Sequence, residues 1–199
     1  MDVSDLKELH YIAPIANIPS ILKLGILSHR EVTRGRVNSV SVALPGVQER
    51  RASRVIPGAK PLHEYVNLYI CGRNPMMYMR SSHHDELCVL RIVCSVLNLP
   101  GVIIADGNAA SRYTSFWPSP SGLARIDKGT VFAERWTDPD LIIAWENKRV
   151  KCAEVLVPNK VDARCISGVY VSGQTAESNL SAVASKLAPI IDAHMFFRA

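Results

Sequence analysis

The stretch Leu9-His-Tyr-Ile-Ala-Pro-Ile-Ala-Asn-Ile-Pro-Ser-Ile-Leu22 predicts a β-strand that runs directly into a short α-helix. Apolar residues recur with helical spacing from position 15 to position 24, which is typical of an amphipathic helix. The helix is expected to begin near Asn17, with Pro19 in its first turn, and to end at Gly25. The four residues 9–12 form the preceding strand.

The rest of the chain alternates in the same way between short strands and short helices. Strands are predicted at 65–70, 87–93, 102–105, 151–157 and 167–171 from alternation and β-branched content. Helices are expected at 47–55, 76–80, 136–147 and 176–191, and a loop over 114–129. Without repeats or a linker, residues 1–199 are predicted to form a single α+β domain.

Composition is that of a folded, water-soluble chain. Of 199 residues, 48% are apolar and 21% are charged, enough to bury a core. The apolar runs are too short to span a membrane, and the acidic start of the chain does not resemble a signal peptide. A cytoplasmic location without membrane contact is therefore expected. The five cysteines show no CxxC pair, which argues against a zinc site or a disulfide framework.

The positive charge is concentrated in one region. The net charge is +5, and six arginines fall within 25 residues: Arg30, Arg34, Arg36, Arg50, Arg51 and Arg54. Such a cluster suits phosphate binding, since each guanidinium presents a planar fork of donors. A solvated helix face explains the cluster equally well on charge alone.

Three features carry possible chemistry. Glu154 lies among apolar strand residues, where an ionised carboxylate is costly unless it is paired; an exposed glutamate on the polar face of the strand is the alternative. The turn Asp106-Gly-Asn108 follows a buried strand, where ligands often bind, although a purely structural turn would look the same. Three aromatic residues, Tyr113, Phe116 and Trp117, share one loop and either stack on bases or join the core.

Several other site types find little support. The chain has neither GxGxxG nor GxxxxGK[ST], so a bound dinucleotide would lack a Rossmann or P-loop cradle. Pro139-Asp140 with Glu146-Asn-Lys148 is superficially similar to a metal-dependent nuclease signature, but the two parts are too close for separate strands. His83-His84-Asp85-Glu86 is interpreted as an exposed loop rather than a metal site. The residues alone indicate an α+β domain with a basic cluster.

Taken together, six motifs resemble the DarT family of toxins that ADP-ribosylate DNA. In chain order they are Leu9 to Leu22, quoted above, Val47-Gln-Glu-Arg-Arg51, Leu62-His-Glu-Tyr-Val-Asn-Leu-Tyr69, Arg73-Asn-Pro-Met-Met-Tyr78, Asp106-Gly-Asn-Ala109 and Ala153-Glu-Val-Leu-Val157. The likeness covers about residues 8 to 172. It implies an ADP-ribosyltransferase-like split β-sheet core with flanking helices, which holds NAD+ in a bent form.

The resemblance also implies roles for individual residues. Motif matching places the catalytic glutamate at Glu154 and an essential arginine at Arg51. The residues expected to contact NAD+ are His10, Tyr11, Ile12, Asn17, Leu27 and Arg51. Those expected to contact DNA are Arg50, Arg54, Tyr78, Asn108, Tyr113, Phe116 and Trp117. No metal is expected.

The implied function is NAD+-dependent mono-ADP-ribosylation of a nucleobase in single-stranded DNA. Many family members read Tyr-His-Ile-Thr-His where this chain reads His10-Tyr-Ile-Ala-Pro14, and this departure favours guanine over thymine as the target. A toxin role implies an antitoxin that removes ADP-ribose or binds the enzyme. The alternatives are an RNA or protein acceptor, or a non-catalytic nucleic-acid-binding module.

Overall fold

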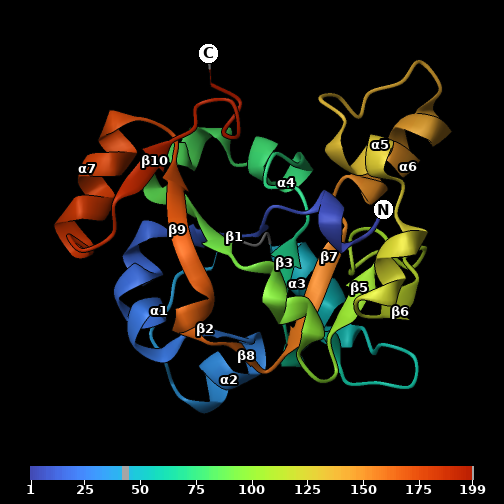
Figure 1. Ribbon diagram of the computed structural model, residues 1–199, viewed down its shortest axis with the longest axis horizontal. Helices are drawn as coiled ribbons and strands as arrows, with labels where there is room; N and C mark the ends of the chain where they lie inside the picture. The colour runs from blue at the N-terminus through green and yellow to red at the C-terminus, as the bar shows by residue number, and fades with distance from the viewer. Residues whose placement is uncertain (42–44, 199) are drawn as a thin grey trace.

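The computed structural model describes residues 1–41 and 45–198, and its centre is an eight-stranded sheet (Figure 1). In chain order the strands are β1 (Leu9–Pro14), β3 (Tyr65–Tyr69), β4 (Leu87–Ile92), β5 (Ile103–Ala105), β6 (Phe116–Pro118), β7 (Glu154–Pro158), β9 (Ile166–Val171) and β10 (Pro189–Ile191). Their spatial order is β10-β9-β4-β1-β3-β7-β5-β6. Neighbouring strands are antiparallel except β9 and β10, which are parallel. A small second sheet joins β2 (Ile26–Leu27) to β8 (Lys160–Val161).

The large sheet is nearly divided between β1 and β3. Strand β1 pairs with β4 along its whole length, and β3 pairs with β7 from Tyr65 to Tyr69. Between β1 and β3, the described residues pair only where His10 lies opposite Tyr69. The two halves therefore diverge on either side of one pairing, which confirms the predicted α+β class with a split sheet.

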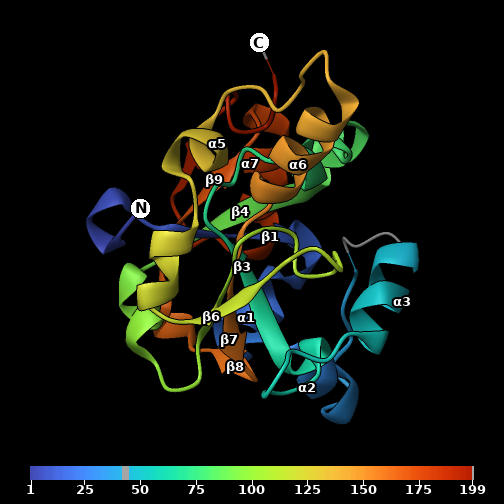
Figure 2. The same cartoon turned by 90° about the vertical axis from the view of Figure 1, so that its right-hand side faces the viewer.

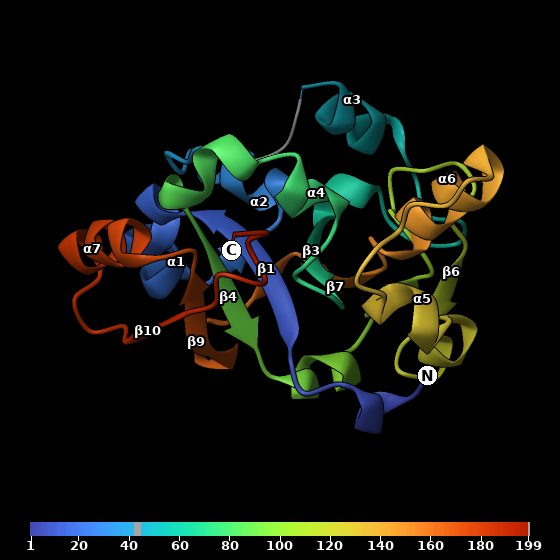
Figure 3. The ribbon, with the colours of Figure 1, turned by 90° about the horizontal axis from the view of Figure 1, so that it is seen from above.

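Helices gather at both ends of the sheet (Figure 3). Helices α1 (Ile18–Leu24) and α7 (Gln174–Val183) lie toward the β9 and β10 end, whereas α5 (Lys128–Phe132) and α6 (Leu141–Val150) lie toward the β6 end. Helix α3 (Pro45–Ser53) stands off from the sheet, next to α2 (His29–Arg34) in the chain (Figure 2). Helix α4 (Pro75–Tyr78) follows β3.

The two faces of the sheet are packed differently. One face carries the main core, in which Leu90 and Val155 lie with Ile18 of α1 and Leu180 of α7. The opposite face holds two smaller apolar clusters, one around Met77 and Phe196, the other around Leu62 and Leu156. Because side chains alternate along a strand, Glu154 and Leu156 of β7 point to the same face of the sheet. This is the face that holds the two smaller clusters.

The entry into α1 follows its sequence signals. Asn17 is the N-cap residue, Pro19 lies in the first turn, and Gly25 ends the helix with a φ of +84°. A Cβ at Gly25 would lie 2.5 Å from the carbonyl oxygen of Val161. Only glycine tolerates both this conformation and this close approach, so the predicted stop signal is confirmed.

Other sequence predictions were wrong in their boundaries. Helix α6 begins at Leu141 rather than near residue 136, because the Asp140 side chain caps the backbone N–H groups of Ile142 and Ile143. The predicted 114–129 loop contains the edge strand β6. The C-terminal helix ends at Val183, and residues 189–191 pair with β9 instead.

The His83-His84 segment is also different from the exposed loop that the sequence suggested. Residues 81–86 form a 3-10 helix, and His84 is buried with its Nε2 2.9 Å from the carbonyl oxygen of Met77. In the part of the chain that the structure describes, no group of histidine, cysteine, aspartate and glutamate side chains is arranged to hold a metal ion. No helix of residues 1–41 and 45–198 is long and apolar enough to cross a bilayer.

Candidate active site

A pocket of about 580 Å³ lies where the sheet is divided. Its walls come from β1 and β3 on the sheet, from α1 and β2 beside it, and from α3 and α6 across it. Figures 2 and 3 show α3 standing away from the strands on this side. The volume falls in the range of cofactor and small-molecule sites.

A buried ion pair lies beside this pocket: Arg51 lines the pocket, and its partner Glu154 does not. Glu154 is the first residue of β7 and is 1% exposed, and Arg51 of α3 is 8% exposed. The Nη1 of Arg51 donates to Glu154 Oε1 at 3.4 Å and to Oε2 at 3.2 Å. The exposed-strand interpretation of Glu154 is therefore wrong, and the cost of burying its charge is offset by this guanidinium.

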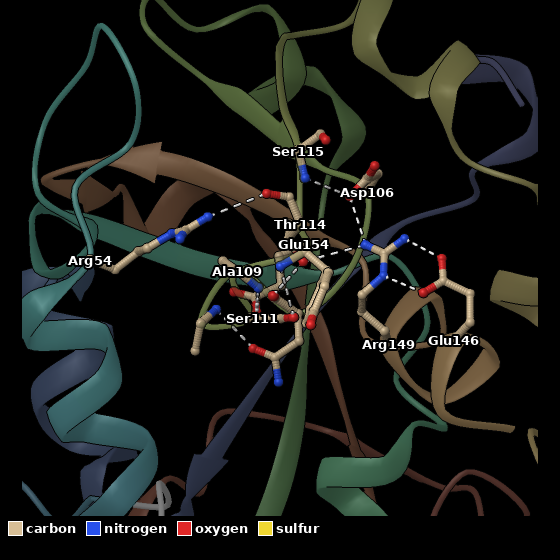
Figure 4. Close-up of polar contacts among 12 residues, drawn as sticks. Arg54, Asp106, Ala109, Ser111, Thr114, Ser115, Glu146, Arg149 and Glu154 are labelled. Carbon is tan, nitrogen blue, oxygen red and sulfur yellow. Dashed lines mark hydrogen bonds and ion pairs between the residues drawn. The ribbon is translucent and has the colours of Figure 1, made fainter. Parts of the chain in front are cut away.

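The turn after β5 supplies a second donor to the same carboxylate. The backbone N–H of Ala109 donates to Glu154 Oε1 at 3.0 Å, as Figure 4 shows. The turn itself is held by Asp106, whose Oδ1 accepts the N–H of Ser115 at 2.9 Å. Asn108 closes it by accepting the N–H of Ala110 at 2.9 Å. The turn therefore contributes directly to the arrangement of the acidic centre.

Two ionisable neighbours of Glu154, Tyr69 and Cys152, are held in their protonated forms. Burial raises the pKa of Tyr69 well above its usual value, and the nearby Glu154 raises it further. Burial also raises the pKa of Tyr11 and raises that of the Cys152 thiol to about 12. Since only a thiolate is an effective nucleophile, Cys152 is unsuited to that role.

Most of the residues predicted to contact NAD+ meet at the pocket. Tyr11, Ile12, Asn17, Leu27 and Arg51 all line it. The side chain of Asn17 makes two hydrogen bonds to the backbone of Val40, its Nδ2 to the carbonyl at 2.8 Å and its Oδ1 to the N–H at 2.9 Å. Asn17 thus fixes the segment that follows α2 against the pocket wall.

His10 is placed differently. It is not among the residues that line the pocket, and its Nε2 lies 3.5 Å from Glu8 Oε1. Burial opposes ionisation of Glu8, but hydrogen bonds from His10, Arg91 and Tyr170 outweigh it and lower the pKa of Glu8 to about 2. The structure therefore places His10 of β1 in a polar cluster around Glu8, and its contact with NAD+ stays a prediction.

The residues predicted to contact DNA are brought together only in part. Arg50 and Asn108 line the pocket. Tyr113 is 59% exposed, and the guanidinium of Arg54 lies 5.5 Å from the centre of the Phe116 ring. Tyr78 is exposed and packs edge-on against the rings of Trp136 and Phe197.

Trp117 lies apart from this group. Its neighbour in β6, Phe116, packs against the apolar cluster around Leu62 and Leu156, and alternation turns Trp117 to the other side of the sheet. There it lines a separate hollow, with the guanidinium of Arg125 4.6 Å from its ring centre. The interpretation of the three loop aromatics as one base-stacking set is thus not supported for Trp117.

The sequence analysis gave no individual role to three further pocket residues, Trp145, His29 and His63. Trp145 of α6 lines the pocket and packs edge-on against Tyr113, with ring centres 5.0 Å apart. His29 and His63 also line it and are stacked with ring centres 4.1 Å apart. The sequence signal for Trp145 was its place in the apolar run Leu141-Ile-Ile-Ala-Trp145. In the structure, Leu141 and Ile142 of this run are exposed. No local pattern distinguished the two histidines.

Comparison with known proteins identifies the family to which the chain belongs. A family model described as ssDNA thymidine ADP-ribosyltransferase, DarT, matches residues 10–197. The chain is 35% identical over 197 residues to a DNA ADP-ribosyl transferase–DNA ADP-ribosyl glycohydrolase fusion protein of Thermosipho africanus, covering 96% of this chain and 49% of that protein. The chain belongs to the DarT family. It spans about half the length of this relative.

Solved DarT structures share the fold. Thermosipho africanus DarTG in complex with ADP-ribose superimposes with a TM-score of 0.82 at 33% identity, covering 97% of this chain and 52% of that one. Thermus sp. 2.9 DarT in complex with ADP-ribosylated ssDNA gives a TM-score of 0.81 at 22% identity, covering 94% and 95% of the two chains. The same Thermus DarT has also been solved with NAD+. These matches confirm the predicted fold of the DarT transferase.

Proposed function

We propose that this chain transfers ADP-ribose from NAD+ to a base of single-stranded DNA, with Glu154 and Arg51 at the chemical centre. The observation that carries the proposal is the buried pair of Glu154 and Arg51 beside a pocket of about 580 Å³, in a chain of the DarT family. A DarT relative is solved with NAD+ and with ADP-ribosylated ssDNA, which supports both substrates.

Breaking the bond between the nicotinamide nitrogen and C1′ of its ribose leaves positive charge on the sugar. A fixed carboxylate stabilises that charge without having to reorganise. The Glu154 carboxylate accepts hydrogen bonds from Arg51 and from the N–H of Ala109. A carboxylate has about four acceptor positions, so others remain. The remaining positions accept a hydrogen bond from a ribose hydroxyl and take up the proton that a base nitrogen loses when it bonds to C1′. Nicotinamide leaves as a neutral molecule.

Arg51 is proposed to contact a substrate in addition to pairing with Glu154. Among the described residues, the Arg51 side chain donates only through Nη1, to the Glu154 carboxylate. Its Nε and Nη2 groups are thus available to hold a phosphate of NAD+ or to orient the incoming base. Holding both reactants in line would supply much of the rate acceleration.

The DNA is proposed to be single-stranded because a duplex hides the base nitrogens inside the stack. Arg50, Asn108 and the exposed Tyr113 lie at or beside the pocket and suit backbone and base contacts. The departure from the common family motif at His10 to Pro14 favours guanine as the modified base. The description of the matching family model names thymidine instead. The proposed setting is the cytoplasm.

A toxin role is proposed together with an antitoxin that reverses the modification. The Thermosipho relative joins a transferase to a DNA ADP-ribosyl glycohydrolase in one chain, which supports such a partner for a chain that matches its transferase half. Purified glycohydrolase would be expected to remove the adduct.

The test uses NAD+ and short single-stranded oligonucleotides that each lack one base type, read by mass spectrometry. A mass increase of one ADP-ribose that disappears only with the guanine-free oligonucleotide supports the full proposal. Loss only with the thymine-free oligonucleotide retains the reaction and corrects the base. NAD+ consumption without a DNA adduct redirects the acceptor to RNA or protein, and no NAD+ consumption by folded protein supports a binding module.

A further inference from the structure

Arg149, at the C-terminal end of α6, lines the pocket and packs against the turn that contacts Glu154 (Figure 4). Its side chain is 9% exposed. Its Nη1 donates to Asp106 Oδ1 at 2.8 Å, while Nε and Nη2 donate to the two carboxylate oxygens of Glu146 at 2.8 and 2.6 Å. With a carboxylate on each side, its charge is already compensated, so Arg149 is not placed to bind a phosphate.

The backbone of Arg149 holds the same turn. Its carbonyl oxygen accepts the N–H of Asn108 at 3.1 Å. A Cβ built at Gly107 would lie 2.4 Å from Arg149 Nη1 and 3.0 Å from its carbonyl oxygen. The turn is therefore pressed against both the guanidinium and the main chain of Arg149, and a glycine is required for that approach.

The far end of the turn reaches the reactive carboxylate. Ala109 is completely buried in the cluster with Leu156, and its N–H donates to Glu154 Oε1 at 3.0 Å. A continuous series of contacts thus runs from Glu146 through Arg149 and Asp106 to the N–H that orients Glu154. Displacing the turn would move this donor, because Ala109 lies three residues beyond Asp106.

We propose that Arg149 is a positioning residue that, through Asp106 and the turn to Ala109, fixes the orientation of the Glu154 carboxylate for transfer. The inference rests on the proposed function for the role of Glu154. It adds an arginine that makes no contact with Glu154 itself. A small displacement of a catalytic group is enough to cost about 10²-fold in rate.

The test compares variants in the transfer of ADP-ribose to a single-stranded oligonucleotide, with thermal unfolding measured in parallel. Arg149→Lys and Asp106→Ala are expected to lower kcat by about 10- to 100-fold, while KM for NAD+ changes by less than about threefold, because uniform binding is not removed. Asp106→Asn should retain most of the activity, since an amide oxygen still accepts from Arg149 and Ser115. The control is Arg198→Lys, because the Nη1 of Arg198 also donates to an aspartate, Asp85, at 2.8 Å.

A double-mutant comparison separates positioning from a general loss of structure. In a Glu154→Gln background, adding Arg149→Lys should cause no further loss of the residual rate, because residues that act as one unit are not additive. Wild-type kcat in Arg149→Lys, or an equal fold loss in the Glu154→Gln background, would overturn the inference. If wild-type protein makes no DNA adduct, the proposed DNA acceptor is wrong. The same comparison of variants, measured as NAD+ hydrolysis, then decides the role of Arg149. Absence of NAD+ hydrolysis by the wild type would overturn both the proposed function and the role of Arg149.

Discussion

Arg51 and Glu154 are 103 residues apart in the chain, yet Arg51 Nη1 lies 3.2 Å from Glu154 Oε2 in a buried pair. The helix that carries Arg51 stands off from the sheet, and the strand that carries Glu154 lies within it. The pair therefore links α3, whose Arg51 lines the pocket, to strand β7 of the sheet. The stability of the site is expected to depend on this pair, and the proposed chemistry uses both residues.

Removing Arg51 should destabilise the protein because it leaves a buried carboxylate without its charged partner. Arg51→Met is expected to lower the free energy of unfolding by about 3 kcal/mol, measured by urea denaturation. Adding Glu154→Gln should recover part of that loss. Arg54→Met is the matched control, since the Arg54 side chain makes one hydrogen bond, of 3.4 Å, to the carbonyl of Thr114. Equal losses for Arg51→Met and Arg54→Met would contradict this view of the pair.

Tyr113 should contribute to DNA binding rather than to NAD+ binding. It is exposed, lies edge-on to Trp145 at the pocket and is not among the pocket-lining residues. Stacking on a base is worth about 1–3 kcal/mol, so Tyr113→Ala is expected to raise KM for the oligonucleotide about tenfold. Tyr113→Phe, which keeps the ring, should behave like wild type. An unchanged KM in Tyr113→Ala would remove this residue from the DNA surface.

Arg50 should contribute to the salt dependence of DNA binding. It is exposed at the pocket wall, and each phosphate contact to a single strand adds about 0.7 to the slope of log affinity against log salt. Arg50→Gln is expected to reduce that slope by about this amount, as measured by fluorescence anisotropy. Arg164→Gln serves as a control because Arg164 pairs with Asp162 away from the pocket. A slope unaffected by Arg50→Gln would exclude the contact.

The stacked histidine pair predicts how stability depends on pH. Burial lowers the pKa of His63 from 6.5, and the neighbouring His29 and Arg51 lower it further. The native state then binds fewer protons than the unfolded state just below pH 6.5, so stability falls as pH drops through that value and is flat above it. His63→Gln should flatten this dependence between pH 7 and pH 5 in thermal unfolding. His84, whose pKa is also lowered by burial, accounts for remaining slope; an unaltered slope in His63→Gln would refute the assignment.

Local signals in the sequence predicted the elements that depend on neighbouring residues. Asn17, Pro19 and Gly25 marked both ends of α1 correctly, because capping and glycine conformation act within one turn. The start of α6 was misplaced because Pro139 suits a first turn, whereas the Asp140 side chain caps the helix one residue later. The strand at Pro189–Ile191 could not be foreseen, since it depends on pairing with β9.

The site shows the same division between local and distant information. The apolar neighbours of Glu154 indicated that its charge needed a partner, and motif resemblance supplied Arg51. The burial of both, and the donation from Ala109, depend on how β5, β7 and α3 come together. Arg149 gave no signal because a long charged side chain near a helix end is usually solvated; its burial depends on Asp106, 43 residues earlier in the chain.

The central claim is that the Glu154 carboxylate carries transfer, and Glu154→Gln tests it most directly. The substitution preserves size and the acceptor for Ala109 while removing the negative charge. Wild-type protein and the variant would be incubated with NAD+ and a single-stranded oligonucleotide, and the ADP-ribosyl adduct would be quantified over time by mass spectrometry, with unfolding temperatures compared. The account predicts an adduct with wild type and a rate at least about 10²-fold lower in folded Glu154→Gln protein. Transfer at the wild-type rate by that variant would contradict it.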